Sequence, residues 1–255
     1  MSKRDREGNV RVHENKQKPA APVTQFTPMF QKFRDELDEH HDRRERIIKA
    51  SRDVTALSKK IIFTCQRVNK LGELPNFAQK EISTRMEEIK NHLTAIEGDI
   101  QGVNRYRYAY SLRCLEELVE ALSFSHYLRT QTLISLEDTT AAVPANVPLT
   151  ENDYMYGLFD LFGEMMRFAT VTTAQTGQLA GMEGRNILSD IHELSSCFEI
   201  LPEIPTRDFR GKMEVMRQSV RKVEKLGYGL AIRGTERPKG WVPDMKEDFD
   251  PSSFA

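Results

Sequence analysis

Two pairs of acidic residues stand in the middle of the chain, and the spacing within each pair would place both carboxylates on the same face of a helix. Glu117 and Glu120 lie three residues apart in LEELVEALSF, and Asp160 and Glu164 lie four apart in DLFGE. Side chains at these spacings share one face of a helix, so each pair could direct two carboxylates at one point. Grouped carboxylates either share protons at raised pKa values or bind a hard cation such as Mg²⁺. A cation held in this way can activate water and neutralise charge on a phosphodiester, which is the chemistry of nucleases.

The ordinary explanation of such a pair is a solvated helix face, because glutamate is a good helix former. The neighbours of Glu117 and Glu120 weaken that explanation. On one continuous helix, the same side would carry aromatic residues, namely Tyr106, Tyr110, Phe124 and Tyr127. From the residues alone, a metal site, a pH-sensitive acid cluster and a structural polar network between helices all stay open.

The elements that must position these acids are helices. Apolar residues recur at helical spacing over six segments, and no segment shows the alternation of a strand or the turn of a hairpin. We therefore predict an all-α, single-domain bundle of about six or seven helices with a long N-terminal helix. The predicted helices cover residues 28–71, 76–101, 104–135, 151–173, 185–201 and 206–232. The short connection at 137–148 would make the two acid-bearing helices antiparallel neighbours, and Thr150 is predicted to cap the second of them with Asp153.

Composition restricts the function classes. The chain has 255 residues with 39% apolar and 29% charged side chains, and its net charge of −1 excludes a polycation that coats nucleic acid nonspecifically. Its three cysteines, Cys65, Cys114 and Cys197, lack metal-binding spacing and are typical of reduced thiols in an intracellular protein. No apolar run has the length of a signal peptide or a membrane span, so we expect a soluble protein.

The two ends of the chain differ from its centre. Residues 1–25 form a polar arm with six basic and three acidic residues, which we predict to be disordered. Three roles stay open for such an arm: a nuclear import signal, a segment that contacts RNA, or a solubilising tail. The helical domain is predicted to span residues 26–235, followed by an irregular tail at 236–255.

Four blocks of sequence resemble the translin family of all-α proteins. These blocks are SRDVTALSKKIIF at 51–63, LEELVEALSFSHYLRTQTLIS at 115–135, DYMYGLFDLFGEMMR at 153–167 and KVEKLGYGLAIRGTERPK at 222–239. Within that family the chain resembles the larger of the two partner subunits. Translin itself lacks acids at the positions that match Glu117 and Glu120.

The resemblance implies a translin-like fold and an activity. The implied activity is a Mg²⁺-dependent endoribonuclease that cuts single-stranded RNA inside a closed hetero-oligomer with translin, expected to be octameric. Glu117, Glu120, Asp160 and Glu164 would be its catalytic, metal-binding set. The implied roles are passenger-strand removal in RNA silencing and processing of tRNA fragments, in the cytoplasm and the nucleus.

Some features depart from the family or leave alternatives. The connection at 137–148 is shorter than in animal members, and the loop TAQTGQLAGMEG does not match the family's small-residue turn. Arginines that flank the acidic segment are candidates for RNA phosphate contacts, although surface arginines would look the same: Arg105, Arg107, Arg113 and Arg129.

The alternative function is a non-catalytic RNA- or DNA-binding or scaffolding partner that stabilises translin. A weaker alternative is a helical adaptor for DNA-repair or trafficking proteins.

Overall fold

The computed structural model describes residues 23–182 and 184–233 of the chain. Most of the predicted arm at 1–25 and all of the predicted tail at 236–255 lie outside these ranges. The chain divides into two units, residues 1–42 and 43–255, which we treat separately. Within the described residues the fold is built from α-helices, so the all-α prediction is confirmed.

The first helix, α1, runs from Thr27 to Cys65 and is the predicted long N-terminal helix. In the first unit its apolar side chains are exposed, and the rings of Phe30 and Phe33 make an edge-to-face contact. In the second unit one stripe of the helix is buried at helical spacing, including Ile47, Val54 and Ile61. The helix ends at Cys65, six residues before the predicted end.

The second helix, α2, covers Asn76–Ile96 and continues into the 3₁₀ turn η1 at Glu97–Ile100. It begins directly after Pro75, whose φ and ψ of −56° and 147° are not helical. Asp99 in η1 accepts two hydrogen bonds from Arg46 of α1, at 2.8 Å each. This bidentate contact ties α2 to the second-unit part of α1.

The predicted third helix is divided into three pieces: α3 at Val103–Arg107, the 3₁₀ turn η2 at Ala109–Leu112 and α4 at Cys114–Thr130. The regular helix is interrupted at Tyr108, whose φ and ψ of −104° and 17° are not helical. As a result Tyr106 and Tyr110 are 79% and 90% exposed. The helix-wheel argument that placed them on one face with Glu117 and Glu120 assumed an unbroken helix, so it does not apply to these separate pieces.

The connection between the acid-bearing helices contains a short helix that we did not predict, α5 at Leu136–Ala142. The next helix, α6, covers Glu151–Thr176 and starts at the predicted cap. Thr150 Oγ1 accepts a hydrogen bond from Asp153 N, and Asp153 Oδ2 accepts one from Thr150 N. The capping box fixes the start of α6, and hence the register of Asp160 and Glu164.

Two strands of two residues each correct the prediction that the chain has no hairpin. β1 at Gly181–Met182 pairs antiparallel with β2 at Arg185–Asn186. They are too short to show alternation in the sequence. The strands approach so closely at Gly181 that an added Cβ would lie 2.0 Å from the carbonyl oxygen of Arg185.

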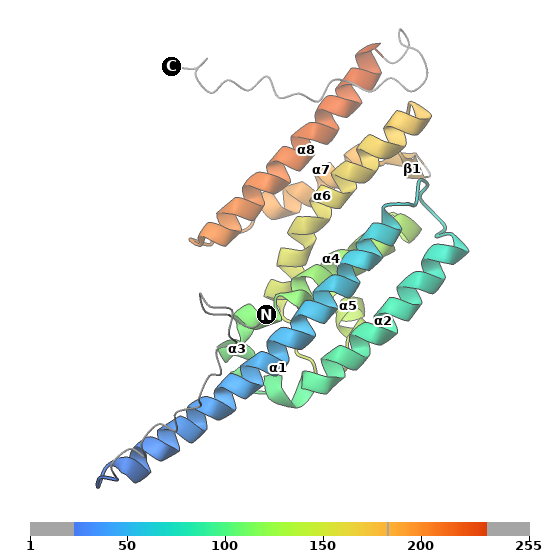
Figure 1. The fold of residues 1–255 in the computed structure, drawn as a ribbon. Coiled ribbons are helices and arrows are strands. Elements are labelled where there is room, and N and C mark those ends of the chain that lie inside the picture. Colours follow the sequence, from blue (N-terminus) through green and yellow to red (C-terminus); the bar gives the residue numbers. More distant parts are fainter. Residues whose placement is uncertain (1–22, 183, 234–255) are drawn as a thin grey trace, which may run out of the picture. The chain divides into compact units, whose positions relative to one another are not determined.

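The last two helices are α7 at Ile187–Glu199 and α8 at Arg207–Arg233. α4 packs against α6, and α6 packs against α7 and α8, which runs alongside it in Figure 1. Phe159 of α6 contacts Phe198 of α7 and Phe209 of α8 edge to face. No helix among the described residues is long and apolar enough to cross a membrane.

Candidate functional site

The acid-bearing helices α4 and α6 meet at Gly157. A Cβ at this position would lie 2.5 Å from Cβ of Val119 and 2.6 Å from the carbonyl oxygen of Glu116. Real Cβ atoms do not come so close, so the contact requires glycine. Asp160 stands three residues beyond this contact on α6, while on α4 the contact involves Glu116 itself and Val119, next to Glu120.

The contacts advance in the same direction along both helices, from Gly157 with Glu116 and Val119 to Asp160 and Glu164 with Glu120, so the prediction of antiparallel neighbours is wrong. The connection between the helices leads the chain back to α3, where Arg105 donates to the carbonyl oxygen of Pro148.

The four predicted acids influence one another across these helices. Burial, together with the charges of Asp160, Glu117 and Glu164, raises the pKa of Glu120 to about 8. Burial is also the largest cause of a raised pKa at Glu117. Near neutral pH the Glu120 carboxyl therefore holds a proton, because ionising it would add negative charge to a half-buried acidic surface. We call the surface formed by Glu116, Glu117, Glu120, Asp160 and Glu164 the acid face.

Three side chains from other parts of the chain hold the outer members of the acid face. Lys212 of α8 places Nζ 2.6 Å from Oδ2 of Asp160, and Gln66 donates from Nε2 to Oε2 of Glu164 at 2.9 Å. Lys59 of α1 lies with Nζ 3.8 Å from Oε1 of Glu117. Periodicity missed all three, because their roles depend on how α1 and α8 pack beside α4 and α6.

Glu116 is a fifth acid that the sequence analysis left out. Its carboxylate lies 3.4 Å from Nε of Arg113 and 3.9 Å from Nζ of Lys212. Burial raises its pKa, although Arg113 and Lys212 act in the opposite direction. Its position four residues before Glu120 was the available signal, since this spacing also places two side chains on one helix face.

The donor chemistry of the acid face fits a hard cation, although its present arrangement does not form a coordination shell. Among the residues that the structure describes, no three histidine, cysteine or acidic side chains are grouped so that they could hold a metal ion. The acids instead contact Lys59, Gln66 and Lys212. All five acids nevertheless offer oxygen ligands, and their negative charges exceed the positive charges of the two lysines. Cation binding would therefore require these side chains to turn away from their present partners.

Asp160 and Lys212 line a groove of about 590 Å³ that also includes Tyr110 and Arg207. A neighbouring groove of about 400 Å³ shares Tyr110 and reaches Glu116. Asp160 and Glu116 of the acid face therefore line grooves that carry both cationic and aromatic side chains.

The four candidate arginines occupy different environments. Arg105 is buried; it forms an ion pair with Asp153 and donates to the carbonyl oxygen of Pro148 at 2.9 Å. Arg113 pairs with Asp208 and Glu116. Its guanidinium, like that of Arg105, is therefore engaged within the chain. Arg107 and Arg129 are exposed.

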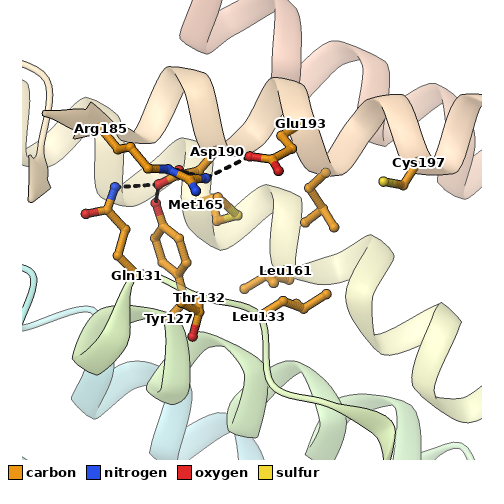
Figure 2. Close-up of a pocket in the computed structure, with 11 residues that line it drawn as sticks. Tyr127, Gln131, Thr132, Leu133, Leu161, Met165, Arg185, Asp190, Glu193 and Cys197 are labelled. Atoms are coloured by element: carbon orange, nitrogen blue, oxygen red, sulfur yellow. Dashed lines mark hydrogen bonds and ion pairs between the residues drawn. The ribbon is translucent and has the colours of Figure 1, made fainter. Parts of the chain in front are cut away.

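A second cavity, of about 280 Å³, lies between α4, α6 and α7 (Figure 2). Its floor contains Leu161 and Met165, and its polar wall is organised by the buried carboxylate of Asp190. Asp190 accepts hydrogen bonds from Tyr127 at 2.8 Å, from Gln131 at 2.6 Å and from Arg185 at 2.6 and 3.0 Å. Because donors from the end of α4 and from β2 satisfy both oxygens of Asp190, this network joins the end of α4 to the hairpin and α7.

The same cavity borders the exposed thiol of Cys197, which lies further along α7 in Figure 2. The other two cysteines, Cys65 and Cys114, are buried. Burial raises their pKa values to about 12 and about 11. The absence of metal-binding cysteine spacing thus agrees with their packing in the core.

Comparisons of the sequence with known proteins all point to the same family. A protein-family model described as the translin family matches residues 42–234. Translin-associated protein X of Rattus norvegicus is 27% identical over 241 residues, which cover 85% of this chain and 82% of the relative. A homologue of translin-associated protein X from Schizosaccharomyces pombe is 28% identical, covering 82% and 89% of the two chains. Translin of Homo sapiens is 26% identical, covering 78% and 89%.

Two solved structures share the fold. A crystal structure of apo-NeC3PO superposes with a TM-score of 0.62 at 17% identity, covering 82% of this chain and all of that chain. A crystal structure of AfC3PO gives a TM-score of 0.58 at 17% identity, covering 80% and 97%. Identity this low is evidence for the fold alone.

Proposed function

The chain belongs to the translin family, and we propose that it is the catalytic subunit of a Mg²⁺-dependent endoribonuclease that cuts single-stranded RNA in a hetero-oligomer with translin. The observation that carries this proposal is the acid face, where acids from two helices meet at the contact of Gly157 with α4, and where burial and the neighbouring acids raise the pKa of Glu120 to about 8. The similarity to translin-associated protein X and to the C3PO structures supports translin as the partner. We extend the proposal to the octameric assembly and to the two expected roles in RNA silencing and tRNA fragment processing.

Glu117, Glu120, Asp160 and Glu164 would hold the cation in this proposal. The chemistry supplied by bound Mg²⁺ is positive charge that acidifies nearby water and offsets charge developing on the phosphodiester. Asp160 and Glu164 are oriented in the free chain by Lys212 and Gln66. Glu120 must release the proton from its carboxyl when a positive charge approaches. The acid face therefore couples cation binding to the loss of a proton.

The test is cleavage of single-stranded RNA by the chain reconstituted with translin, with and without Mg²⁺. We expect Glu120→Ala to abolish cleavage while the complex still assembles. A matched control is Glu203→Gln, which alters an exposed acid outside the acid face. Full activity of the Glu120 variant would refute the proposed role of the acid face.

A second candidate function is a non-catalytic RNA-binding or scaffolding partner that stabilises translin. The specific observation in its favour is that Lys212, Lys59 and Gln66 already engage four of the five acids. Such a network could hold helices together without a metal. This alternative predicts that Mg²⁺ has no effect on RNA turnover and that removing the acids disrupts assembly.

A further inference from the structure

Lys212 is placed differently from an ordinary surface lysine. Its side chain is only 17% exposed, although lysines usually extend into water. Nζ lies 2.6 Å from Oδ2 of Asp160, 3.2 Å from the carbonyl oxygen of Tyr156 and 5.5 Å from the centre of the Tyr156 ring. Several partners therefore fix the ammonium group at the acid face.

Lys59 provides an internal comparison. It also approaches an acid of the site, but its side chain is 65% exposed and its Nζ lies 3.8 Å from Glu117. An exposed pair at this distance is weak, because water screens the charges and the long side chain loses freedom. The two lysines thus bring the same charge to the acid face with different degrees of burial.

The position of Lys212 matters because it lies between acids of two helices. Its Nζ contacts Asp160 of α6 and lies 3.9 Å from Oε2 of Glu116 on α4. It also lowers the pKa of Glu120, opposing the neighbouring acids. A positive charge at this point reduces the repulsion between the acids of the two helices, which a bound cation would also do.

We propose that Lys212 is a positioning residue that serves as the resident counter-ion of the acid face, and that a divalent cation binds by displacing its ammonium group from Asp160. The inference rests on the proposed function, because it concerns how the same acids bind their cation. Tyr156 offers the displaced ammonium group other partners, namely its ring and its carbonyl oxygen. Lys212 would then keep the acid face assembled when no divalent cation is bound.

The test compares divalent-cation affinities of variants in the complex with translin, using Mn²⁺ as the probe. Electron paramagnetic resonance of free Mn²⁺ measures its dissociation constant. We expect Lys212→Met to bind Mn²⁺ about three- to thirtyfold more tightly, because the cation no longer displaces a charged hydrogen bond. Lys59→Met should change the affinity less than about twofold, since its pair is exposed. Lys212→Arg keeps the charge and should stay near the wild-type affinity.

A second measurement separates this role from a purely structural one. In EDTA, Lys212→Met should melt at a lower temperature than the wild type, because the acids lose their counter-ion. Saturating Mn²⁺ should raise the melting temperature of the variant more than that of the wild type. Lys212→Gln, which keeps a hydrogen-bond donor, serves if the methionine variant does not assemble.

The outcomes distinguish this inference from the proposed activity. Equal or weaker Mn²⁺ binding by the folded Lys212 variants would overturn the inference even if the wild-type complex cleaves RNA. Tighter binding by those variants would support it even if the complex shows no cleavage, in which case only the proposed activity fails. A wild-type complex that binds no Mn²⁺ would overturn both.

Discussion

Replacing Glu120 by glutamine should make the metal-free protein more stable, and the gain should grow with pH. The pKa of this carboxyl is raised from 4.5 to about 8 in the folded chain, mainly by burial. Between these values the unfolded chain has released the proton while the folded chain still holds it. Folding stability therefore falls as pH rises from about 4.5 to about 8 and is lowest above that range.

The magnitude follows from the two pKa values. At about 1.4 kcal/mol for each pH unit between them, the upper limit of the effect is about 5 kcal/mol. Solvent penetration reduces it, so we expect Glu120→Gln to gain about 2 to 4 kcal/mol over the wild type at pH 8.5. Near pH 4.5 the two proteins should differ little, because glutamine resembles the protonated acid.

The assay is urea unfolding in EDTA at several pH values from 5 to 9, followed by circular dichroism. The difference between the variant and the wild type isolates Glu120, because other acids of the site titrate in both proteins. Glu203→Gln should show no such pH-dependent difference, since Glu203 is exposed. A stability difference that stays constant from pH 5 to 9 would refute the reasoning about the acid face.

Three further substitutions test how the site is supported, each by chemical denaturation. Gly157→Ala should lower the free energy of unfolding by about 1 to 3 kcal/mol, because the added methyl group overlaps Val119 and the backbone of α4. The control is Gly163→Ala on the same helix, which has open space around it and should leave the free energy of unfolding unchanged or raise it by up to about 1 kcal/mol. Asp190→Ala should cost about 1 to 3 kcal/mol, since the buried hydroxyl of Tyr127 and the buried amide of Gln131 lose their acceptor; a loss below about 1 kcal/mol would contradict the described network. Arg105→Met should cost about 3 to 5 kcal/mol by leaving the nearly buried Asp153 without its ion pair, and an unchanged midpoint would count against that pair.

The fold was predictable from the sequence where long-range contacts were not needed. Apolar spacing identified the long helices, and Thr150 with Asp153 marked the start of α6 as the structure has it. The division at Tyr108 was missed because its neighbours have no proline or strong breaking pattern. The hairpin was missed because its strands hold two residues each, and its close approach at Gly181 depends on a carbonyl four residues away.

The candidate site was predictable only in part, for a related reason. The spacing of Glu117 with Glu120 and of Asp160 with Glu164 is local, so it could be read from the sequence. Lys212, by contrast, is 52 residues beyond Asp160 and reaches it through the packing of α8 on α6. Sequence spacing predicts which side chains share a helix face, whereas the counter-charges of a site depend on tertiary contacts.

The exposure of Cys197 has a practical consequence. Since Cys65 and Cys114 are buried and their thiols are hard to ionise, a maleimide fluorophore should attach to the native chain at a single position without any substitution. That position lies on α7, beside a cavity whose lining includes none of the residues of the acid face. A label there would report assembly with a second subunit through energy transfer while the chemistry of the acid face stays unmodified.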